Sequence, residues 1–315
     1  MMASNKKSNP LVFTGNWNRK LASDICSLSG LTLGKADVST FSDGETKVDL
    51  QEDLYGSDVL FIQSTSPPVN RNLMELFFMV SAASRSGANK ITVIMPYFGY
   101  SRQDRRTTCG SNISAGDVAR MLETAGVNHV VTFDLHSAMC QGFFGPKVRM
   151  DNKSALSIFL EHLGGFEKVS IVSPDAGAYA RSMQFYKLFT ERYPECDISS
   201  AMIFKQRSAA NQIAAAELCG NVEGRDVIIA DDIVDTAGTL CKAAELLIAN
   251  GAKTVTAVIT HGIFSGPALE RIRNSPITRI LTTDSINHSE AVLQEPKIQI
   301  VSLGTEIANI ISGLK

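Results

Sequence analysis

The chain has 315 residues, of which 44% are hydrophobic and 20% are charged, and this length is enough for about two domains with buried cores. The 30 Lys and Arg residues nearly balance the 32 Asp and Glu residues, so the formal net charge is -2 at pH 7. This balance excludes a general attraction to nucleic acid or to an anionic membrane, although a local cluster of cations can still bind a small anion.

The sequence carries no targeting or membrane signal. No apolar run approaches the ~20 residues that a membrane-spanning helix needs, and the polar segment Met1–Pro10 lacks the apolar core of a signal peptide. The six cysteines are scattered, without a Cys-x-x-Cys pair. This spacing is typical of reduced cysteines rather than of a zinc site or a disulfide framework. We therefore expect a cytoplasmic protein that binds neither membrane nor nucleic acid.

Along the chain, short β-rich runs alternate with longer segments of helical spacing. The expected strands are Val59–Gln63, Ile91–Met95, Val130–Phe133, Val169–Val172, Val227–Ala230 and Thr254–Thr260. The expected helices are Asn72–Arg85, Ser114–Ala125 and Thr239–Asn250, and a glycine follows closely after each. Strands that alternate with helices predict an α/β fold with parallel sheets.

The chain also contains a weak internal repeat. Asp58–Gln63 resembles Asp226–Asp231, and Gly87–Ile94 resembles Gly251–Val258, so both copies have the order strand, loop, helix, Gly-Ala, strand. Chance similarity between such units is the simpler explanation, but the ordered agreement favours duplication. We therefore predict two similar domains, residues 1–152 and 153–304, with residues 305–315 packing back on the first.

The most informative segment is Val227–Thr239, in which a buried strand ends in two adjacent carboxylates, Asp231 and Asp232. A loop rich in Asp, Thr and Gly follows, and a helix begins near Thr239. Loops at the carboxyl ends of parallel strands form ligand crevices, and the amides of residues 236–239 at a helix N-terminus can hold a phosphate. Two carboxylates beside a phosphate pocket suit a sugar diol or a cation, so the segment predicts a sugar-phosphate site.

A capped turn between a strand and a helix is the alternative interpretation of this segment, with Asp and Thr present only as capping residues. That alternative explains one Asp and one Thr. It does not explain a second carboxylate at the end of the strand, because an unpaired buried carboxylate is costly. We therefore favour the sugar-phosphate site.

Other polar residues also follow predicted strands. Arg102–Asp104 comes after one strand, and the guanidinium of Arg102 can contact two phosphate oxygens at once. His136 and Asp175 each follow another strand. A lone histidine is more often structural than a ligand, but its position at the end of a strand beside an acid favours a functional role.

Two motifs have simple structural interpretations. Phe41–Glu45 contains Asp-Gly, which favours a tight hairpin turn. Ile198–Phe204 is strand-like and leads through Lys205 and Arg207 into a polar loop, Ser208–Asn211. Taken alone, this second pattern indicates an ordinary basic loop.

Six segments resemble the motifs of one enzyme family, in the family's order: Phe41–Glu45, Tyr97–Arg106, Asp134–Phe144, Val172–Gly177, Asp231–Glu245 and Thr260–Ala268. The loop within Val227–Thr239 is similar to the phosphoribosyl-diphosphate loop of type I phosphoribosyltransferases. The complete set is similar to ribose-phosphate diphosphokinases, also called phosphoribosyl pyrophosphate synthetases. This resemblance implies two tandem, similar type I phosphoribosyltransferase-like domains, each with a parallel sheet flanked by helices.

The resemblance also implies ATP and ribose 5-phosphate as substrates, Mg²⁺ as cofactor, and a homo-oligomer, which in the family is a hexamer. The implied ATP ligands are Phe41, Asp43, Glu45, Arg102, Gln103, Asp104 and His136, with the adenine bound across a subunit boundary. The implied ribose 5-phosphate ligands are Asp231, Asp232, Asp235, Thr236, Ala237, Gly238 and Thr239. The first domain is the ATP side and the second is the ribose 5-phosphate side.

The implied metal ligands are His136 and Asp175, and the implied catalytic residues are Lys205 and Arg207 of a flexible loop. Because Mg²⁺ prefers oxygen ligands, a water-mediated or phosphate contact of His136 is an equal alternative to direct ligation. The two cations are suited to stabilise charge on a diphosphoryl group during its transfer.

Three stretches depart from the family pattern. Where the family shows Asp-Ile-Pro-Val-Asp-Asn, the chain has Gly145–Asn152, which lacks the first acid and matches the second at Asp151 only through two inserted residues. Cys109–Ser114 replaces Arg-x-Pro-Ile-Ser, and the usual C-terminal Ser-Val-Ser-x-Leu-Phe is absent. Phosphate activation and ADP inhibition are therefore not carried over to this chain.

The sequence thus predicts transfer of the diphosphoryl group of ATP to the anomeric hydroxyl of ribose 5-phosphate, which gives 5-phosphoribosyl 1-diphosphate and AMP for nucleotide biosynthesis. Two alternatives stay open. A phosphoribosyltransferase leaves the duplication and the Arg-Gln-Asp motif unexplained. A catalytically silent regulatory homologue is favoured by Gly145 and the missing tail, but retained Lys205, Arg207 and His136 oppose it.

Overall fold

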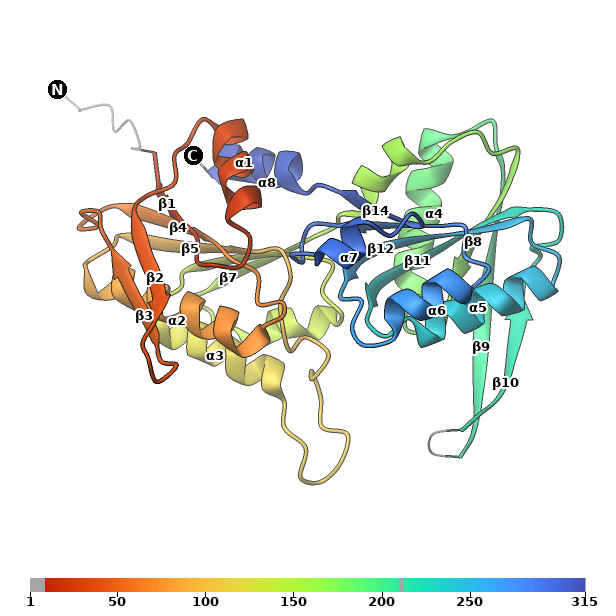
Figure 1. Cartoon of the computed structure of the whole chain (residues 1–315), viewed down its shortest axis with the longest axis horizontal. Helices are drawn as coiled ribbons and strands as arrows, with labels where there is room; N and C mark the ends of the chain where they lie inside the picture. Colours follow the sequence, from red (N-terminus) through yellow and green to blue (C-terminus); the bar gives the residue numbers. More distant parts are fainter. Residues whose placement is uncertain (1–8, 210–211, 315) are drawn as a thin grey trace. The chain divides into compact units, whose positions relative to one another are not determined.

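The computed structural model describes residues 9–209 and 212–314, and for residues 205–209 and 212–216 it describes the backbone alone. The chain separates into two compact units (Figure 1). The first unit is built from the chain up to Lys153, together with Ser285–Asn287 and the C-terminal segment from Ser302. The second unit is built from Ser154–Asp284 and His288–Val301.

The first unit is a five-stranded sheet with helices on both faces. Its elements in chain order are β1 (Leu11–Phe13), α1 (Arg19–Ser29), β2 (Ala36–Thr40), β3 (Thr46–Leu50), β4 (Asp58–Ile62), α2 (Val69–Arg85), β5 (Lys90–Met95), α3 (Ser114–Ala125), β6 (His129–Phe133), the 3-10 helix η1 (Ala138–Phe143), β7 (Arg149–Lys153) and α8 (Gly304–Leu314). The sheet has the order β1-β4-β5-β6-β7, and all neighbours are parallel. Strands β2 and β3 form a separate antiparallel hairpin.

The second unit contains a seven-stranded sheet. Its elements are the 3-10 helix η2 (Leu156–His162), β8 (Lys168–Ser173), α4 (Tyr179–Arg192), β9 (Asp197–Ala209), β10 (Gln212–Cys219), β11 (Asp226–Val234), α5 (Gly238–Ala249), β12 (Thr254–Gly262), α6 (Ala268–Asn274), β13 (Arg279–Thr283), α7 (Glu290–Leu293) and β14 (Ile298–Val301). The order is β10-β9-β8-β11-β12-β13-β14. All neighbours are parallel except β10, which pairs antiparallel with β9 at the edge.

Strand β11 shows why this sheet is covered on both faces. Successive side chains of a strand point to opposite faces, and Val227 and Ile229 belong to a core with α5 and α6, whereas Ile228 and Ala230 belong to a core with α4 and η2. All four residues are buried. Such continuous apolar runs are typical of strands in parallel sheets. In the first unit, α2 and α3 cover one face, and α1 and α8 contact each other on the other (Figure 1).

The expected strands and helices are present, and the predicted α/β fold with parallel sheets is confirmed. The main differences are at element ends: α2 begins three residues earlier than expected, and β11 continues to Val234, because its backbone keeps pairing with β12. The sequence analysis predicted the turn between β2 and β3 and the strand-like start of β9, but it did not assign strand β10 or the helices α1, α4, α6, α7 and α8. The edge strand β10 is the one antiparallel member among the described strands of the large sheet, and the sequence analysis did not predict it.

Both units have the same order of elements. The first unit from β1, and the second from β8 after the 3-10 helix η2, have a strand, a helix, a β-hairpin and a second strand, and then alternate helices with parallel strands. The repeated sequences occupy equivalent places, because Asp58 begins β4 and Asp226 begins β11. This agreement supports the interpretation of the repeat as a duplication.

Two general features concern the described part of the chain. None of its helices combines the length and apolar character that crossing a membrane requires. All six cysteines are free thiols.

Candidate active site

A pocket of about 640 Å³ lies in the first unit, between the start of α2 and the loop that follows β5. Pro68–Arg71 form one wall, and loop residues that include Arg102 and Gln103 form the other. Two of the residues assigned to ATP from the sequence therefore line one cavity. Asp104 follows them in the chain but is not part of this lining.

The loop that carries Arg102 is fixed by the segment after β4. The Ser64 hydroxyl accepts a hydrogen bond from the Tyr97 N–H at 2.8 Å, and the Thr65 hydroxyl accepts one from the Gly99 N–H at 2.7 Å. A Cβ at Gly99 would lie 2.4 Å from the carbonyl oxygen of Thr65, so the close approach requires glycine. Ser64 and Thr65 are completely buried. The wall of the pocket is therefore held in place by the protein itself.

Gln103 and Arg71 add two further contacts around this pocket. The Ser114 hydroxyl at the start of α3 donates to Oε1 of Gln103 at 2.6 Å. Nε of Arg71 lies 3.1 Å from Oε1 of Glu75, a carboxylate that is 1% exposed. Glu75 also accepts from the N–H of Asn16 at 2.8 Å. Arg71 thus brings a second guanidinium to the lining, and the sequence analysis did not assign it.

His136 follows β6, the strand next to β5 in the sheet. Its side chain is exposed, whereas the preceding Asp134 and Leu135 are buried. The N–H of Leu135 donates to Oδ1 of Asn152 at 3.1 Å, which ties this segment to β7. Because β5 and β6 are parallel, His136 and Arg102 follow the strands at the same edge of the sheet, where ligands of such sheets bind.

The predicted hairpin turn at Phe41–Glu45 is confirmed, and it joins β2 to β3. The N–H of Phe41 donates to the carbonyl of Glu45 at 2.8 Å, and the N–H of Glu45 donates to Oδ1 of Asp43 at 3.1 Å. Phe41 is 53% exposed. A large exposed ring on a tight turn is available to stack on a planar ligand.

In the second unit, the loop between β11 and α5 is braced from both sides. Nη1 of Arg271 donates to the carbonyl of Thr236 at 2.9 Å, and the Ser265 hydroxyl donates to Oδ1 of Asp235. Helix α5 begins at Gly238, one residue before the expected start, and Ala237 before it has a left-handed φ of 59°. Thr236 and Thr239 are exposed. The helix N-terminus and two hydroxyls are therefore open to an anion.

The paired carboxylates lie near the end of β11. Asp232 is 4% exposed, and its N–H donates to Oδ1 of Asp231 at 2.9 Å. The pKa of the Asp231 carboxyl is raised to about 8, first by burial and then by the charge of Asp232, while the Asp232 N–H and Arg181 act in the opposite direction. Two crowded carboxylates of this kind favour a cation or hydroxyl donors as partners.

The pair also has a partner in the protein, which the sequence analysis did not find. Nη1 of Arg181, on α4, lies 2.9 Å from Oδ1 of Asp232 and 3.6 Å from Oδ1 of Asp231. The argument that the second carboxylate has no partner without a ligand is therefore wrong, because Arg181 compensates for part of its burial. The exposed threonines and helix N-terminus still distinguish this segment from a simple capped turn.

Asp175 follows β8 and caps the turn that leads into α4. Its Oδ1 accepts from the N–H groups of Gly177 at 3.0 Å and Ala178 at 3.2 Å. Asp175 belongs to the second unit, whereas His136 belongs to the first. Among the described residues, no group of three or more His, Cys, Asp and Glu side chains is arranged to hold a metal ion.

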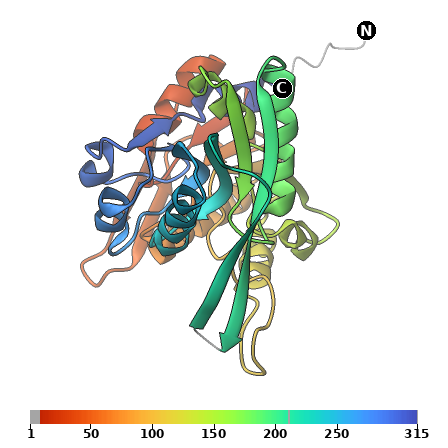
Figure 2. The ribbon, with the colours of Figure 1, turned by 90° about the vertical axis from the view of Figure 1, so that its right-hand side faces the viewer.

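Lys205 and Arg207 lie in β9, where they are paired with Ala216 and Ile213 of β10. Their side chains, and residues 210–211 of the expected loop, lie outside the described part of the chain. The prediction that a loop begins at Ser208 is wrong for the backbone, because pairing with β10 extends the strand to Ala209. Figures 1 and 2 show β9 and β10 as a two-stranded arm that extends beyond the rest of its sheet.

Comparison with known proteins identifies the family. A family model described as the N-terminal domain of ribose phosphate pyrophosphokinase matches residues 11–126, and one described as a phosphoribosyl synthetase-associated domain matches residues 193–314. A ribose-phosphate pyrophosphokinase of Burkholderia pseudomallei is 44% identical over 97% of this chain and 94% of its own length. One of Mesorhizobium japonicum is 41% identical over 96% and 95%. The chain belongs to the ribose-phosphate pyrophosphokinase family.

The fold agrees with this family. The crystal structure of phosphoribosylpyrophosphate synthetase from Mycobacterium smegmatis matches with a TM-score of 0.88 and 30% sequence identity, covering 98% of this chain and 99% of that one. The resemblance inferred from the six motifs is therefore confirmed, as are the tandem phosphoribosyltransferase-like sheets.

In the stretch where this chain departs from the pyrophosphokinase pattern, Gly145 and Asp151 each contact side chains of the first unit. The N–H of Gly145 donates to Oε2 of Glu123 at 3.0 Å, and a Cβ at Gly145 would lie 2.4 Å from Oε1 of the same residue. Asp151 contacts Nε2 of His129 at 3.1 Å and Nη2 of Arg149 at 2.9 Å. Burial raises the pKa of Asp151, but hydrogen bonds from Arg149 and His129 outweigh it and hold the pKa below its usual value. Both acids serve the packing of the first unit.

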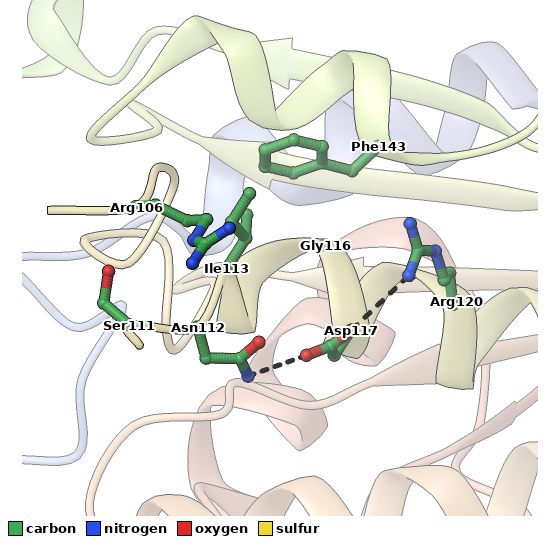
Figure 3. Close-up of a pocket in the computed structure, with 8 residues that line it drawn as sticks. All are labelled: Arg106, Ser111, Asn112, Ile113, Gly116, Asp117, Arg120 and Phe143. Atoms are coloured by element: carbon green, nitrogen blue, oxygen red, sulfur yellow. Dashed lines mark hydrogen bonds and ion pairs between the residues drawn. The ribbon is translucent and has the colours of Figure 1, made fainter. Parts of the chain in front are cut away.

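A second departing stretch, Cys109–Ser114, lines part of another pocket, of about 340 Å³ (Figure 3). Asp117 is one of its lining residues: Nδ2 of Asn112 donates to Oδ2 of Asp117 at 2.7 Å, and Nη1 of Arg120 lies 3.6 Å from Oδ1 of Asp117. Arg106 and the ring of Phe143 complete the lining. None of the residues that line this pocket is among the implied ligands of ATP or ribose 5-phosphate.

Proposed function

We propose that the chain transfers the diphosphoryl group of ATP to the anomeric hydroxyl of ribose 5-phosphate, giving 5-phosphoribosyl 1-diphosphate and AMP. Full-length similarity to ribose-phosphate pyrophosphokinases supports this activity. The observation that carries it is the β11–α5 segment, where a helix N-terminus and exposed threonines lie beside two crowded carboxylates. That combination suits a sugar phosphate better than either feature alone.

Ribose 5-phosphate is held by this segment in the second unit. Its phosphate accepts hydrogen bonds from the amides of residues 236–239 and from the hydroxyls of Thr236 and Thr239, with Asp235 and Ala237 shaping the turn. Its ring hydroxyls donate to Asp231 and Asp232. The braces from Arg271 and Ser265 support this assignment, because they fix the loop before the ligand binds.

ATP is held by residues of the first unit. Arg102 and Gln103 bind the phosphates, and their place in the 640 Å³ pocket supports this role. His136 contributes from the neighbouring strand, and Asp104 from the same loop. Adenine stacks on Phe41 of a neighbouring subunit in a homo-oligomer, and Asp43 and Glu45 accept from its amino group. The exposure of the Phe41 ring supports this stacking role.

Mg²⁺ is the proposed cofactor, and the donor chemistry of the chain fits it in part. The carboxylate of Asp175 is the kind of oxygen ligand that Mg²⁺ prefers. Burial and then the charge of Asp232 raise the pKa of Asp231, and a nearby cation would lower the cost of ionising this pair. The imidazole of His136 is a poorer donor, so a phosphate or water contact suits it better. When bound, Mg²⁺ neutralises negative charge on the transferring group.

The protein's own contribution to the reaction is positioning and charge stabilisation. The anomeric hydroxyl attacks the β-phosphorus of ATP in line and loses its proton to solvent, the bond from this phosphorus to the α–β bridging oxygen breaks, and AMP leaves. Lys205 and Arg207 on β9 stabilise the charge that develops on the diphosphoryl group. Holding both substrates in line supplies much of the remaining rate increase.

The product of ATP turnover tests this function. With ATP, ribose 5-phosphate and magnesium present together, AMP and 5-phosphoribosyl 1-diphosphate should accumulate in equal amounts, and omission of any one should stop the reaction. Accumulation of ADP would indicate transfer of a single phosphoryl group and contradict the proposal. ATP binding without turnover would favour a silent regulatory homologue instead.

The protein acts in the cytoplasm, in keeping with its six free thiols.

A further inference from the structure

Arg181 lies beside Asp231 and Asp232 because its helix, α4, packs against the strand that carries them. Helix α4 packs on β8 and β11. The next residue, Ser182, is 3% exposed, and its hydroxyl donates to the carbonyl of Ala230 at 3.1 Å. Ala230 directly precedes Asp231, so this buried bond fixes the helix against the strand beside the carboxylates.

The contact itself is shared between both acids. A single nitrogen, Nη1 of Arg181, lies 2.9 Å from Asp232 and 3.6 Å from Asp231, and the side chain is only 15% exposed. Charge-assisted hydrogen bonds in such a partly buried place are stronger and more directional than those on the surface. The guanidinium therefore favours the ionised form of the pair and restricts the rotation of its carboxylates.

We propose that Arg181 is a positioning residue, which orients Asp231 and Asp232 for the ring hydroxyls of ribose 5-phosphate and favours their ionised forms when the sugar binds. It acts through the carboxylates and does not touch the sugar. This inference rests on the proposed function, since it assigns the acid pair to the sugar. A neutral or reoriented carboxyl is a weaker acceptor for a hydroxyl than a carboxylate in place.

The first test compares Arg181→Gln with Arg181→Lys by calorimetric titration of ribose 5-phosphate in the presence of magnesium. Arg181→Gln should weaken binding by about tenfold or more, since the charge-assisted bonds that order the acids are lost. Arg181→Lys retains the charge and should recover most of this loss. ATP affinity should change by less than about twofold in both, as expected of a site in the other unit.

A matched control lies on the same helix. Arg192, in the last turn of α4, is exposed and lies over the ring of Tyr193 at 5.3 Å from its centre. Arg192→Gln should change ribose 5-phosphate affinity by less than about twofold, the usual range for surface substitutions. An equal loss in Arg192→Gln and Arg181→Gln would show a general effect of helix charge and contradict the inference.

A double-mutant cycle separates positioning from direct contact. If Arg181 acts through the acids, Arg181→Gln should add less than about twofold to the loss caused by Asp232→Asn. A further tenfold loss in the double variant would show a direct contact with the ligand and overturn the inference. The double variant removes the Arg181 charge together with the Asp232 charge that it pairs with. It therefore still tests for a direct contact between Arg181 and the ligand if Arg181→Gln alone fails to fold.

Ribose 5-phosphate binding by the unmutated chain separates a failure of the proposed function from a failure of the role of Arg181. If the unmutated chain does not bind ribose 5-phosphate, the proposed function is wrong. If the unmutated chain binds it and folded Arg181→Gln binds it equally well, only the role of Arg181 is wrong.

Discussion

The two units share one order of elements but differ at the connection where the proposed sugar site lies. In the second unit, β11 leads through Asp231 and Asp232 to exposed threonines at the start of α5. In the first unit, the equivalent positions after β4 are Gln63 and Ser64, and both are completely buried. At these two positions the first connection is uncharged and completely buried, and we call it the closed connection. The second connection carries two carboxylates that lead to exposed threonines, and we call it the open connection.

The closed connection has a different use. Ser64 and Thr65 hold the loop after β5 through its N–H groups, and this loop carries Arg102. The same place in the fold is thus the proposed sugar-phosphate site in one unit, whereas in the other it supports the loop that carries Arg102. A duplicated unit can specialise in this way without a change of topology, because function depends on the residues at the site.

The hairpins differ as well. Strands β2 and β3 pair only with each other, and their turn presents Phe41. Strands β9 and β10 join the edge of the large sheet, and β9 carries Lys205 and Arg207. We therefore expect the first hairpin to affect nucleotide binding and the second to affect turnover.

The largest expected effect separates these hairpins. Lys205→Ala should lower kcat by about 100-fold, or about 3 kcal/mol, with little change in the KM for ATP, because its charge acts mainly in the transition state. Lys47 of the first hairpin is a matched control, exposed and 2.9 Å from Asp37. Lys47→Ala should change kcat by less than about twofold. Similar rates for both variants would remove β9 from the mechanism.

The second prediction concerns the open connection. Thr239→Val removes a hydroxyl with little change in volume, and it should raise the KM for ribose 5-phosphate by about tenfold or more, the value of a hydrogen bond to a charged group. The KM for ATP should stay unchanged. Thr190→Val, on the exposed part of α4, provides the control. Steady-state kinetics with each substrate varied separately measures both effects, and an unaltered sugar KM would place the phosphate elsewhere.

The third prediction tests the closed connection. Gly99→Ala places a methyl group 2.4 Å from the Thr65 carbonyl, so it should destabilise the fold by about 1–3 kcal/mol and raise the KM for ATP. Gly110→Ala in the same loop meets no atom within 4 Å and should change stability by less than about 0.5 kcal/mol. Urea unfolding of both variants measures the difference. Equal stability would mean that the loop is not held by Thr65.

The smallest expected effect is a release of protons. The pKa of Asp231 is raised to about 8 without ligand, and donation from the sugar hydroxyls with Mg²⁺ nearby lowers it. Binding at pH 7 should therefore release a fraction of a proton, and affinity should rise as the pH increases towards 8 and then level off. Calorimetry in buffers of different ionisation enthalpy measures the release, and Asp231→Asn should abolish it. Proton uptake on binding would contradict the assignment.

The sequence predicted correctly those features whose residues are close neighbours in the chain. The apolar run of β11, the acids at its end and the helix start near Gly238 are neighbours in the chain, so their arrangement could be predicted from the order of residues. The Asp-Gly turn after Phe41 was predictable for the same reason.

Residues that act across the fold could not be predicted in this way. Arg181 meets the acid pair only because α4 packs on β11, and Arg271 reaches Thr236 from α6. Arg71 enters the first pocket because α2 begins earlier than the apolar spacing indicated. Each of these contacts depends on tertiary packing, and none has a signature in the neighbouring sequence.

A crystal structure with ribose 5-phosphate and magnesium tests the central claim most directly, which is that only the open connection of the second unit binds the sugar phosphate. The account predicts the phosphate at the amides of residues 236–239 and the ring hydroxyls at Asp231 and Asp232. A phosphate bound at the start of α2 in the first unit, with the β11–α5 loop empty, would contradict it.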